Sequence, residues 1–209
     1  EKWYWLAAVV LGVLLSLLFA AHWTEGYADM IQKGIGGKVV RFHVLANSDS
    51  EADQALKLAV RDRVLQEYGD LLETCTSKEE TLAALKNAQQ EISETAEAEV
   101  LAQGYTYPVR VSLVREEFPF KKYGDLIFPA GVYDALRIEI GEAKGKNWWC
   151  VLYPQMCYVD AAWGYSTEES HVRLQNTLTK EEFLVVSAME QKKVTPKIKC
   201  RLVELWSER

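Results

Sequence analysis

The strongest constraint on this chain is an uninterrupted apolar run near its N-terminus. Residues 3–21 read WYWLAAVVLGVLLSLLFAA, which is 19 residues without a charged side chain. A helix of that length spans roughly 28 Å, close to the thickness of the hydrocarbon core of a bilayer. Aromatic residues bracket the run, namely Trp3, Tyr4, Trp5 and Trp23, and such rings favour the boundary between membrane and water. The run is apolar on every face, which disfavours a helix buried in a soluble core.

Two interpretations of this segment stay open, a cleaved signal peptide and a retained transmembrane anchor. Signal peptides usually carry an apolar stretch of about 7–15 residues and a small-x-small cleavage site. The run here is longer, which favours the anchor, and the best cleavage motif is Gly26-Tyr27-Ala28. We therefore expect a signal peptide or anchor over residues 1–28, a flexible glycine-containing linker over 29–37, and an extracytoplasmic domain over 38–209.

The composition excludes several classes of protein. The chain has 24 Lys+Arg against 30 Asp+Glu, a net charge of −6, so it lacks the overall basic character of a nucleic-acid-binding domain. Four cysteines are too few for a mini-protein held together by disulfides. With 5 Pro and 12 Gly, the chain is also unlike a low-complexity disordered protein. We expect one mildly acidic folded domain after the apolar segment.

The first part of that domain reads as one strand followed by two helices. Residues 38–46 are β-branched and apolar, which is typical of a strand. Ser48 and Glu51 have the spacing of a capping box, so a helix is expected to start there. A second capping box begins at Ser77, and an amphipathic stripe continues from it to Gly104, a residue suited to end a helix.

Beyond residue 104 the hydrophobic period changes to two, as in strands with one buried face. The alternating sets are 109–113, 136–140, 148–152 and 198–202. The polar stretch between the second and third sets predicts a hairpin, and a short helix is expected to start near Thr179. The order predicts an α+β fold, an antiparallel-rich sheet of about five strands with two long amphipathic helices on one face, preceded by an N-terminal hydrophobic helix.

The motifs of the common catalytic and metal sites do not occur. There is no Walker loop, no G-x-G-x-x-G, no H-E-x-x-H and no C-x-x-C. Cys150 or Cys157 with His43 as base and Asp49 as its orienter would make a cysteine hydrolase. The alternation turns Cys150 toward the core, however, and favours a structural role for His43. We expect no catalytic residue, no cofactor, no metal ion and no small-molecule substrate.

Cys150 and Cys157 are separated by a strand end and a turn at Pro154. That separation lets their Cα atoms approach to about 5–6 Å, the spacing of a disulfide, and an oxidising compartment favours the bond. Two reduced, partly buried thiols are the alternative, and the sequence does not decide between them.

Three blocks of residues go beyond generic patterning. The first reads R-x-H-V-x-A-N-S-D from Arg41, followed by D-Q-x-x-K and V-R-D. The second reads F-P…Y-G…F-P-A-G-x-Y-x-A-L-R from Phe118, and the third G-K-N-W-W-C-V-L-x-P…C from Gly145. Together they resemble the stage II sporulation protein R family of endospore-forming bacteria, over most of residues 38–160.

This resemblance implies a signalling protein that is not an enzyme. Members of the family are made in the forespore and exported into the space between the forespore and mother-cell membranes. There they trigger a membrane-embedded aspartic protease of the mother cell, which cleaves the pro-sequence of sigma factor E. An envelope hydrolase and a structural protein of the septum are the alternative functions.

A protein ligand of this kind binds through a few anchoring side chains, often aromatic or Arg. The candidate partner-contact residues are Asn47, Asp49, Asp53, Arg61, Tyr123, Phe128 and Trp149. Trp148 is expected to face the core, and therefore Trp149 points to the opposite face of its strand, either covered by other elements or exposed. Trp149 is the strongest candidate of the set.

Overall fold

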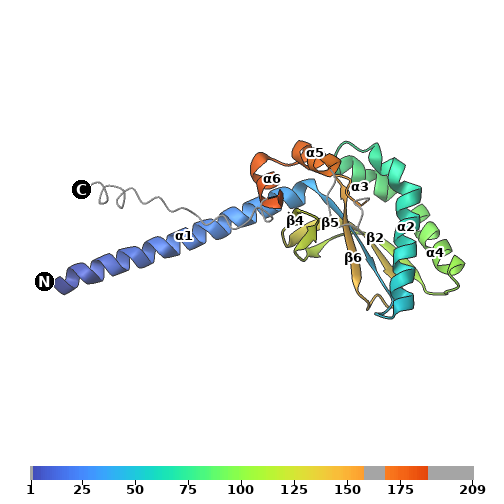
Figure 1. Cartoon of the computed structure of the whole chain (residues 1–209), viewed down its shortest axis with the longest axis horizontal. Helices are drawn as coiled ribbons and strands as arrows, with labels where there is room; N and C mark the ends of the chain where they lie inside the picture. Colours follow the sequence, from blue (N-terminus) through green and yellow to red (C-terminus); the bar gives the residue numbers. More distant parts are fainter. Residues whose placement is uncertain (1, 158–167, 188–209) are drawn as a thin grey trace.

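The computed structural model describes residues 2–157 and 168–187, and it shows the predicted α+β class (Figure 1). In chain order the elements are α1 (Lys2–Lys38), β1 (Val40–Leu45), α2 (Glu51–Glu73), α3 (Lys78–Asn87), α4 (Gln89–Ala102), β2 (Val109–Phe118), β3 (Lys121–Tyr123), β4 (Leu126–Phe128), β5 (Gly131–Ile140), β6 (Asn147–Tyr153), α5 (Glu168–Thr177) and α6 (Lys180–Ser187). The strand predicted at 198–202 lies outside the described residues.

Four strands form a mixed sheet in the order β2-β5-β1-β6, and β3 pairs with β4 in a small separate sheet. Strand β1 runs parallel to β5 and antiparallel to β6, and β2 runs antiparallel to β5. The predicted hairpin between β5 and β6 is wrong, because β1 lies between them, with Phe42 opposite Leu136 on one side and Cys150 on the other. Alternation identifies strands but not their partners, and β1, which is buried on both faces, takes the central place.

Helices α2, α3 and α4 cover one face of the sheet, as the amphipathic stripes predict (Figure 1). The second predicted helix is divided into α3 and α4 at Ala88, directly after the weak helix former Asn87. Helix α2 begins two residues later than expected, because Ser50 and not Ser48 accepts the capping hydrogen bond from the Asp53 amide at 3.1 Å. Ser77 caps α3 as predicted.

The opposite face of the sheet carries a second core, built with the end of α1, the β3–β4 pair, α5 and α6. Ile31, Ile35 and Val39 are buried in it. Residues 29–37 are therefore not a flexible linker but the last turns of α1. These apolar residues recur every four positions, so they continue the helix through the glycines and dock it.

The N-terminal two-thirds of α1 projects away from the domain (Figure 1). Its most apolar window has a mean hydropathy of 2.3 and is unburied, so by length and composition it can cross a membrane. Trp3 and Trp5 are 86% and 76% exposed to solvent. A helix this apolar and this exposed fits a signal peptide or a membrane anchor.

Candidate partner interface

The predicted contact residues near the end of β1 form a clamp between two turns. The Asp53 carboxylate accepts hydrogen bonds from Asn47 at 2.9 Å and from the Ser48 hydroxyl at 2.5 Å. The Asn47 side-chain oxygen accepts from the Glu142 amide at 2.9 Å, and Asp49 accepts from the Lys146 amide at 2.7 Å. These bonds join the turn after β1 to the turn after β5.

The clamp is built around a buried carboxylate. Asp53 is 4% exposed, so burial alone would raise its pKa, but the hydrogen bonds from Ser48 and Asn47 outweigh burial and lower it. Asp53 is therefore charged at neutral pH and internally satisfied. Its burial excludes direct contact with a partner in this conformation, whereas Asp49 stays exposed.

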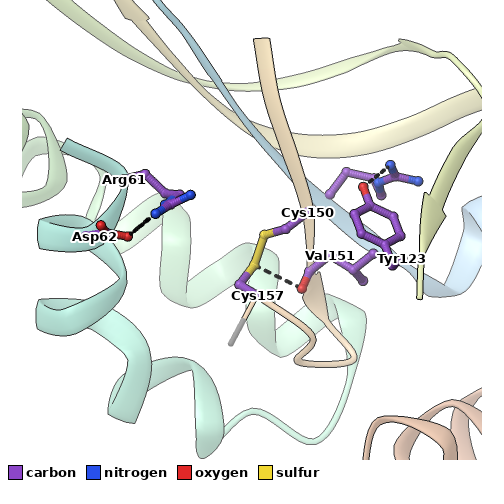
Figure 2. Close-up of a disulfide and its surroundings, with 7 residues drawn as sticks. Arg61, Asp62, Tyr123, Cys150, Val151 and Cys157 are labelled. Atoms are coloured by element: carbon purple, nitrogen blue, oxygen red, sulfur yellow. Dashed lines mark hydrogen bonds and ion pairs between the residues drawn. A yellow bond between two sulfur atoms is a disulfide. The ribbon is translucent and has the colours of Figure 1, made fainter. Parts of the chain in front are cut away.

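Arg61 lies on α2, on the helix-covered side of the sheet. Its guanidinium lies 4.7 Å from the ring centroid of Trp148 and pairs with Asp62 at 2.6 Å. Figure 2 shows Arg61 and Tyr123 on opposite sides of the strand that carries Cys150. The predicted contact residues therefore fall into two groups, one on each side of the sheet.

The second group surrounds Arg41, a fully buried residue of β1. Four aromatic rings lie with their centroids 4.9–5.6 Å from its guanidinium carbon, namely Phe118, Tyr123, Phe128 and Tyr133. Arg41 Nη2 donates to the Tyr123 hydroxyl at 2.8 Å, while burial lowers the pKa of Arg41. The cluster fixes the β3–β4 pair to the main sheet. Phe128, fully buried within it, cannot contact a partner in this conformation.

Trp149 lies on this same face and is half-buried, with its ring held by neighbours. Its centroid lies 4.6 Å from that of His43 and 4.8 Å from that of Phe118, both in edge-to-face geometry. The Lys121 ammonium lies 5.2 Å from the ring centroid. Trp149 is therefore covered in part by other elements, and the residue is neither fully buried nor fully exposed.

His43 is 4% exposed and sits between Trp149 and charged side chains of the neighbouring strands. Burial, with smaller contributions from Arg137 and Arg41, lowers the pKa of His43 from 6.5 to about 4. His43 Nε2 lies 3.3 Å from a Glu116 oxygen, but the ring is neutral at pH 7, so this contact is not an ion pair. Arg137 pairs with the other oxygen of Glu116 at 3.0 Å.

Cys150 and Cys157 are joined in a disulfide, with Cα atoms 5.4 Å apart (Figure 2). Cys150 belongs to the helix-covered core, while His43 faces the other side of the sheet. The nucleophile and base of a cysteine hydrolase are therefore not brought together. Cys75 carries a free thiol, and Cys200 lies outside the described residues. Among residues 2–157 and 168–187, no group of three His, Cys, Asp or Glu side chains could hold a metal ion.

Sequence reasoning missed the buried cation Arg41 and the Glu116–Arg137 pair that line the second face. A signal for Arg41 existed, since one charged side chain interrupts an apolar strand two positions from His43. Alternation places Arg41 and His43 on the same face, but it does not reveal that four aromatic side chains from other strands surround the cation.

Comparison with known proteins settles the family of this chain. A profile of the stage II sporulation protein R family matches residues 36–163. The stage II sporulation protein R of Bacillus subtilis (strain 168) is 32% identical over 184 residues, which cover 83% of this chain and 82% of that relative. The chain belongs to the stage II sporulation protein R family. No solved structure matches it.

The match to the stage II sporulation protein R family begins within the last turn of α1 and extends past the disulfide. It therefore includes both turns of the clamp, the cluster around Arg41, and Trp149. The residue blocks from which the sequence predicted this family are the ones that build these features. Most of them serve the interior of the fold, and Trp149 and Asp49 remain on its surface.

Proposed function

We propose that this protein is a forespore-to-mother-cell signal that activates a membrane-embedded aspartic protease, which then processes pro-sigma factor E during endospore formation. Membership of the stage II sporulation protein R family carries this proposal. The exposed apolar part of α1 supports it, because a signal between two membranes must be exported or anchored with its domain outside the cytoplasm.

A protein ligand activates its receptor by binding one state of the receptor more tightly than another, and it need not catalyse any reaction itself. The domain must bind the active state of the protease more tightly than the inactive state, since equal binding to both shifts nothing. Each tenfold preference corresponds to about 1.4 kcal/mol. Two packed cores on one sheet give the domain a fixed surface on which such a preference can be built.

Trp149 is the residue of the predicted set that best fits a contact with the protease. Tryptophan is enriched among the side chains that dominate binding energy, and a ring already held by His43 and Phe118 loses little conformational freedom on binding. Tyr123 and Arg61 are half-buried, so their exposed parts can contact the protease, while the Asn47 side chain is hydrogen-bonded within the clamp.

The proposal is tested by combining the full chain, the candidate protease and its pro-sigma precursor in membrane vesicles. We expect precursor cleavage that depends on the chain. Cleavage at the same rate without the chain contradicts the proposal and, if processing is also normal in cells lacking the chain, favours a structural role in the septum. Turnover of a substrate by the chain alone would favour the envelope hydrolase.

The role of Trp149 is tested in the same vesicles with Trp149→Ala. We expect a loss of processing of at least tenfold with the fold retained. Leu101→Ala is the matched control, because Leu101 is a large apolar side chain that is 64% exposed at the end of α4. Full processing with a folded Trp149→Ala variant rejects the contact.

A further inference from the structure

The membrane-competent helix and the domain are joined without a hinge. Ile31 and Ile35, on successive turns of α1, are 8% and 0% exposed, and Val39 directly after the helix is also buried. Gly36 lies so close to the sheet that an added Cβ would meet the Val132 carbonyl oxygen at 2.6 Å. The end of α1 is thus in close contact with strand β5.

Polar contacts hold the same segment. The Lys38 ammonium pairs with Glu182 of α6 at 2.6 Å, with the Glu182 side chain 7% exposed. The Lys78 ammonium donates to the Gly36 carbonyl oxygen at 2.8 Å and pairs with Asp134 at 2.6 Å. The end of α1 is therefore held to the domain by contacts with α3, β5 and α6, and the helix continues without a break into its apolar part.

The helix also sets the height of the domain. We place the membrane–water boundary at Trp23, because tryptophan favours that position, and the residues of α1 that line the domain surface are five to ten positions further on, at 28–33. At 1.5 Å per residue, these positions stand about 8–15 Å above the boundary. The part of the domain beside them is therefore held close to the membrane.

That part of the domain contains an open groove of about 690 Å³. Its lining comes from α1, from the end of β2 and from the turn into β5, and its charged side chains are Asp29, Lys33, Arg115 and Glu117. Two acidic and two basic side chains give it no net charge. Such a lining does not select an anionic headgroup or a phosphate, and it suits a polypeptide of mixed polarity.

One wall of the groove is an edge of the sheet formed by the described residues. Within that sheet, strand β2 pairs with β5 only, so its other side has no strand beside it. The Val111 carbonyl points outward at this edge, where it accepts a hydrogen bond from the Gln89 side chain at 3.0 Å. Outward and inward groups alternate along a strand, so the main-chain groups of Arg115 and Glu117 also point outward, at the groove. They have no main-chain partner among the described residues.

We propose that α1, retained in the membrane, holds this groove at a fixed height, where it receives an extended, membrane-proximal extracytoplasmic segment of the membrane-embedded partner, paired along the outer edge of β2. An edge with free N–H and C=O groups binds an extended segment through main-chain hydrogen bonds, and the groove supplies contacts for its side chains. This inference rests on the proposed function and adds a second, membrane-proximal contact to that of Trp149.

The first test places a photo-crosslinking amino acid at Glu117 in the full chain, in vesicles with the protease. Arg110 is the matched control, because it is exposed on the same strand, at the end away from the groove. We expect an adduct with the protease from position 117 and none from position 110. Adducts at neither position, adducts at both, adducts with lipid, or adducts of twice the chain's mass overturn the inference.

The second test separates the strand edge from the side chain. Glu117→Pro removes an outward N–H without removing a hydrogen bond between β2 and β5, and Glu117→Ala keeps that N–H. We expect at least a tenfold loss of processing for Glu117→Pro and less than a twofold loss for Glu117→Ala. Equal processing by both variants contradicts the inference. If the Glu117→Pro variant fails to fold, the crosslinking result at positions 117 and 110 decides whether the groove is the docking site.

The unaltered chain separates failure of the inference from failure of the proposed function. If it supports processing while position 117 gives no adduct, the function stands and the groove is not the docking site. If it does not support processing, the proposed function fails and the inference falls with it.

Discussion

His43 makes the stability of this protein depend on pH between about 4 and 6.5. The ring is 4% exposed and lies near Arg41 of its own strand β1, Arg137 of β5 and Glu116 of β2, and its pKa falls to about 4. In the unfolded chain a histidine has a pKa of about 6.5. As the pH drops through this interval, the unfolded state binds a proton that the folded state does not, so stability is lost.

The size of the effect follows from the two pKa values. Lowering the pH from 7.5 to 5 costs the folded state about 2 kcal/mol through this one group. For a chain of this length that loss corresponds to a drop in Tm of about 4–8 °C. Replacing His43 with glutamine removes the titrating group, so that the variant should lose about 2 kcal/mol less than the unaltered chain over the same pH interval.

The assay is unfolding of the full chain in detergent micelles at both pH values, followed by near-ultraviolet circular dichroism. Carboxylates that titrate in this interval contribute equally to both proteins and cancel in the difference. His22→Gln is the control, because His22 is exposed on α1. Equal losses of stability for the His43→Gln variant and the unaltered chain would refute the argument, as would a folded-state pKa of His43 near 6.5 measured by NMR.

Two further pairs of substitutions test the packing. Asp53→Ala leaves the partly buried donors of Asn47 and Ser48 without their partner and should cost about 3 kcal/mol in urea unfolding, against less than about 0.5 kcal/mol for Asp70→Ala, an exposed acid on the same helix. Similar losses in the free energy of unfolding for the two variants would show that the clamp does not stabilise the fold. Gly36→Ala should destabilise the chain by about 1–3 kcal/mol, because its Cβ would strike Val132. The same change at Gly26, where a Cβ meets open space, should stabilise α1 by about 0.5–1 kcal/mol. Thermal unfolding in which Gly36→Ala and Gly26→Ala both stabilise or both destabilise the chain contradicts this packing.

Several local features were readable from the sequence because their causes are local. The apolar run of α1, the cap at Ser77 and the turn at Gly104, which has a φ of 84°, each depend on residues a few positions apart. The family could also be recognised, because its residue blocks are contiguous. The alternation along β6 placed Cys150 and Trp149 on opposite faces, as observed.

Features that join distant segments were not readable. Nothing in residues 38–46 shows that this strand lies between β5 and β6, because an apolar strand can pair on either side. Glycines at 34, 36 and 37 suggested a flexible linker, but they sit in α1, where the close approach of the β5 backbone leaves no room for a side chain at 36. Whether such a glycine allows flexibility or close packing depends on the segments that lie beside it in the fold.

By itself, the sequence determined that an apolar helix long enough to cross a membrane precedes an α+β domain of the stage II sporulation protein R family. Hydropathy, periodicity and contiguous residue blocks are properties of the chain alone. Only the tertiary structure decided that the end of α1 packs into the domain, that Arg41 lies among four aromatic side chains, and that Asp53 and Phe128 are interior rather than surface residues. Burial and pairing are set by segments that meet in space, and a residue's own neighbours in sequence do not record them.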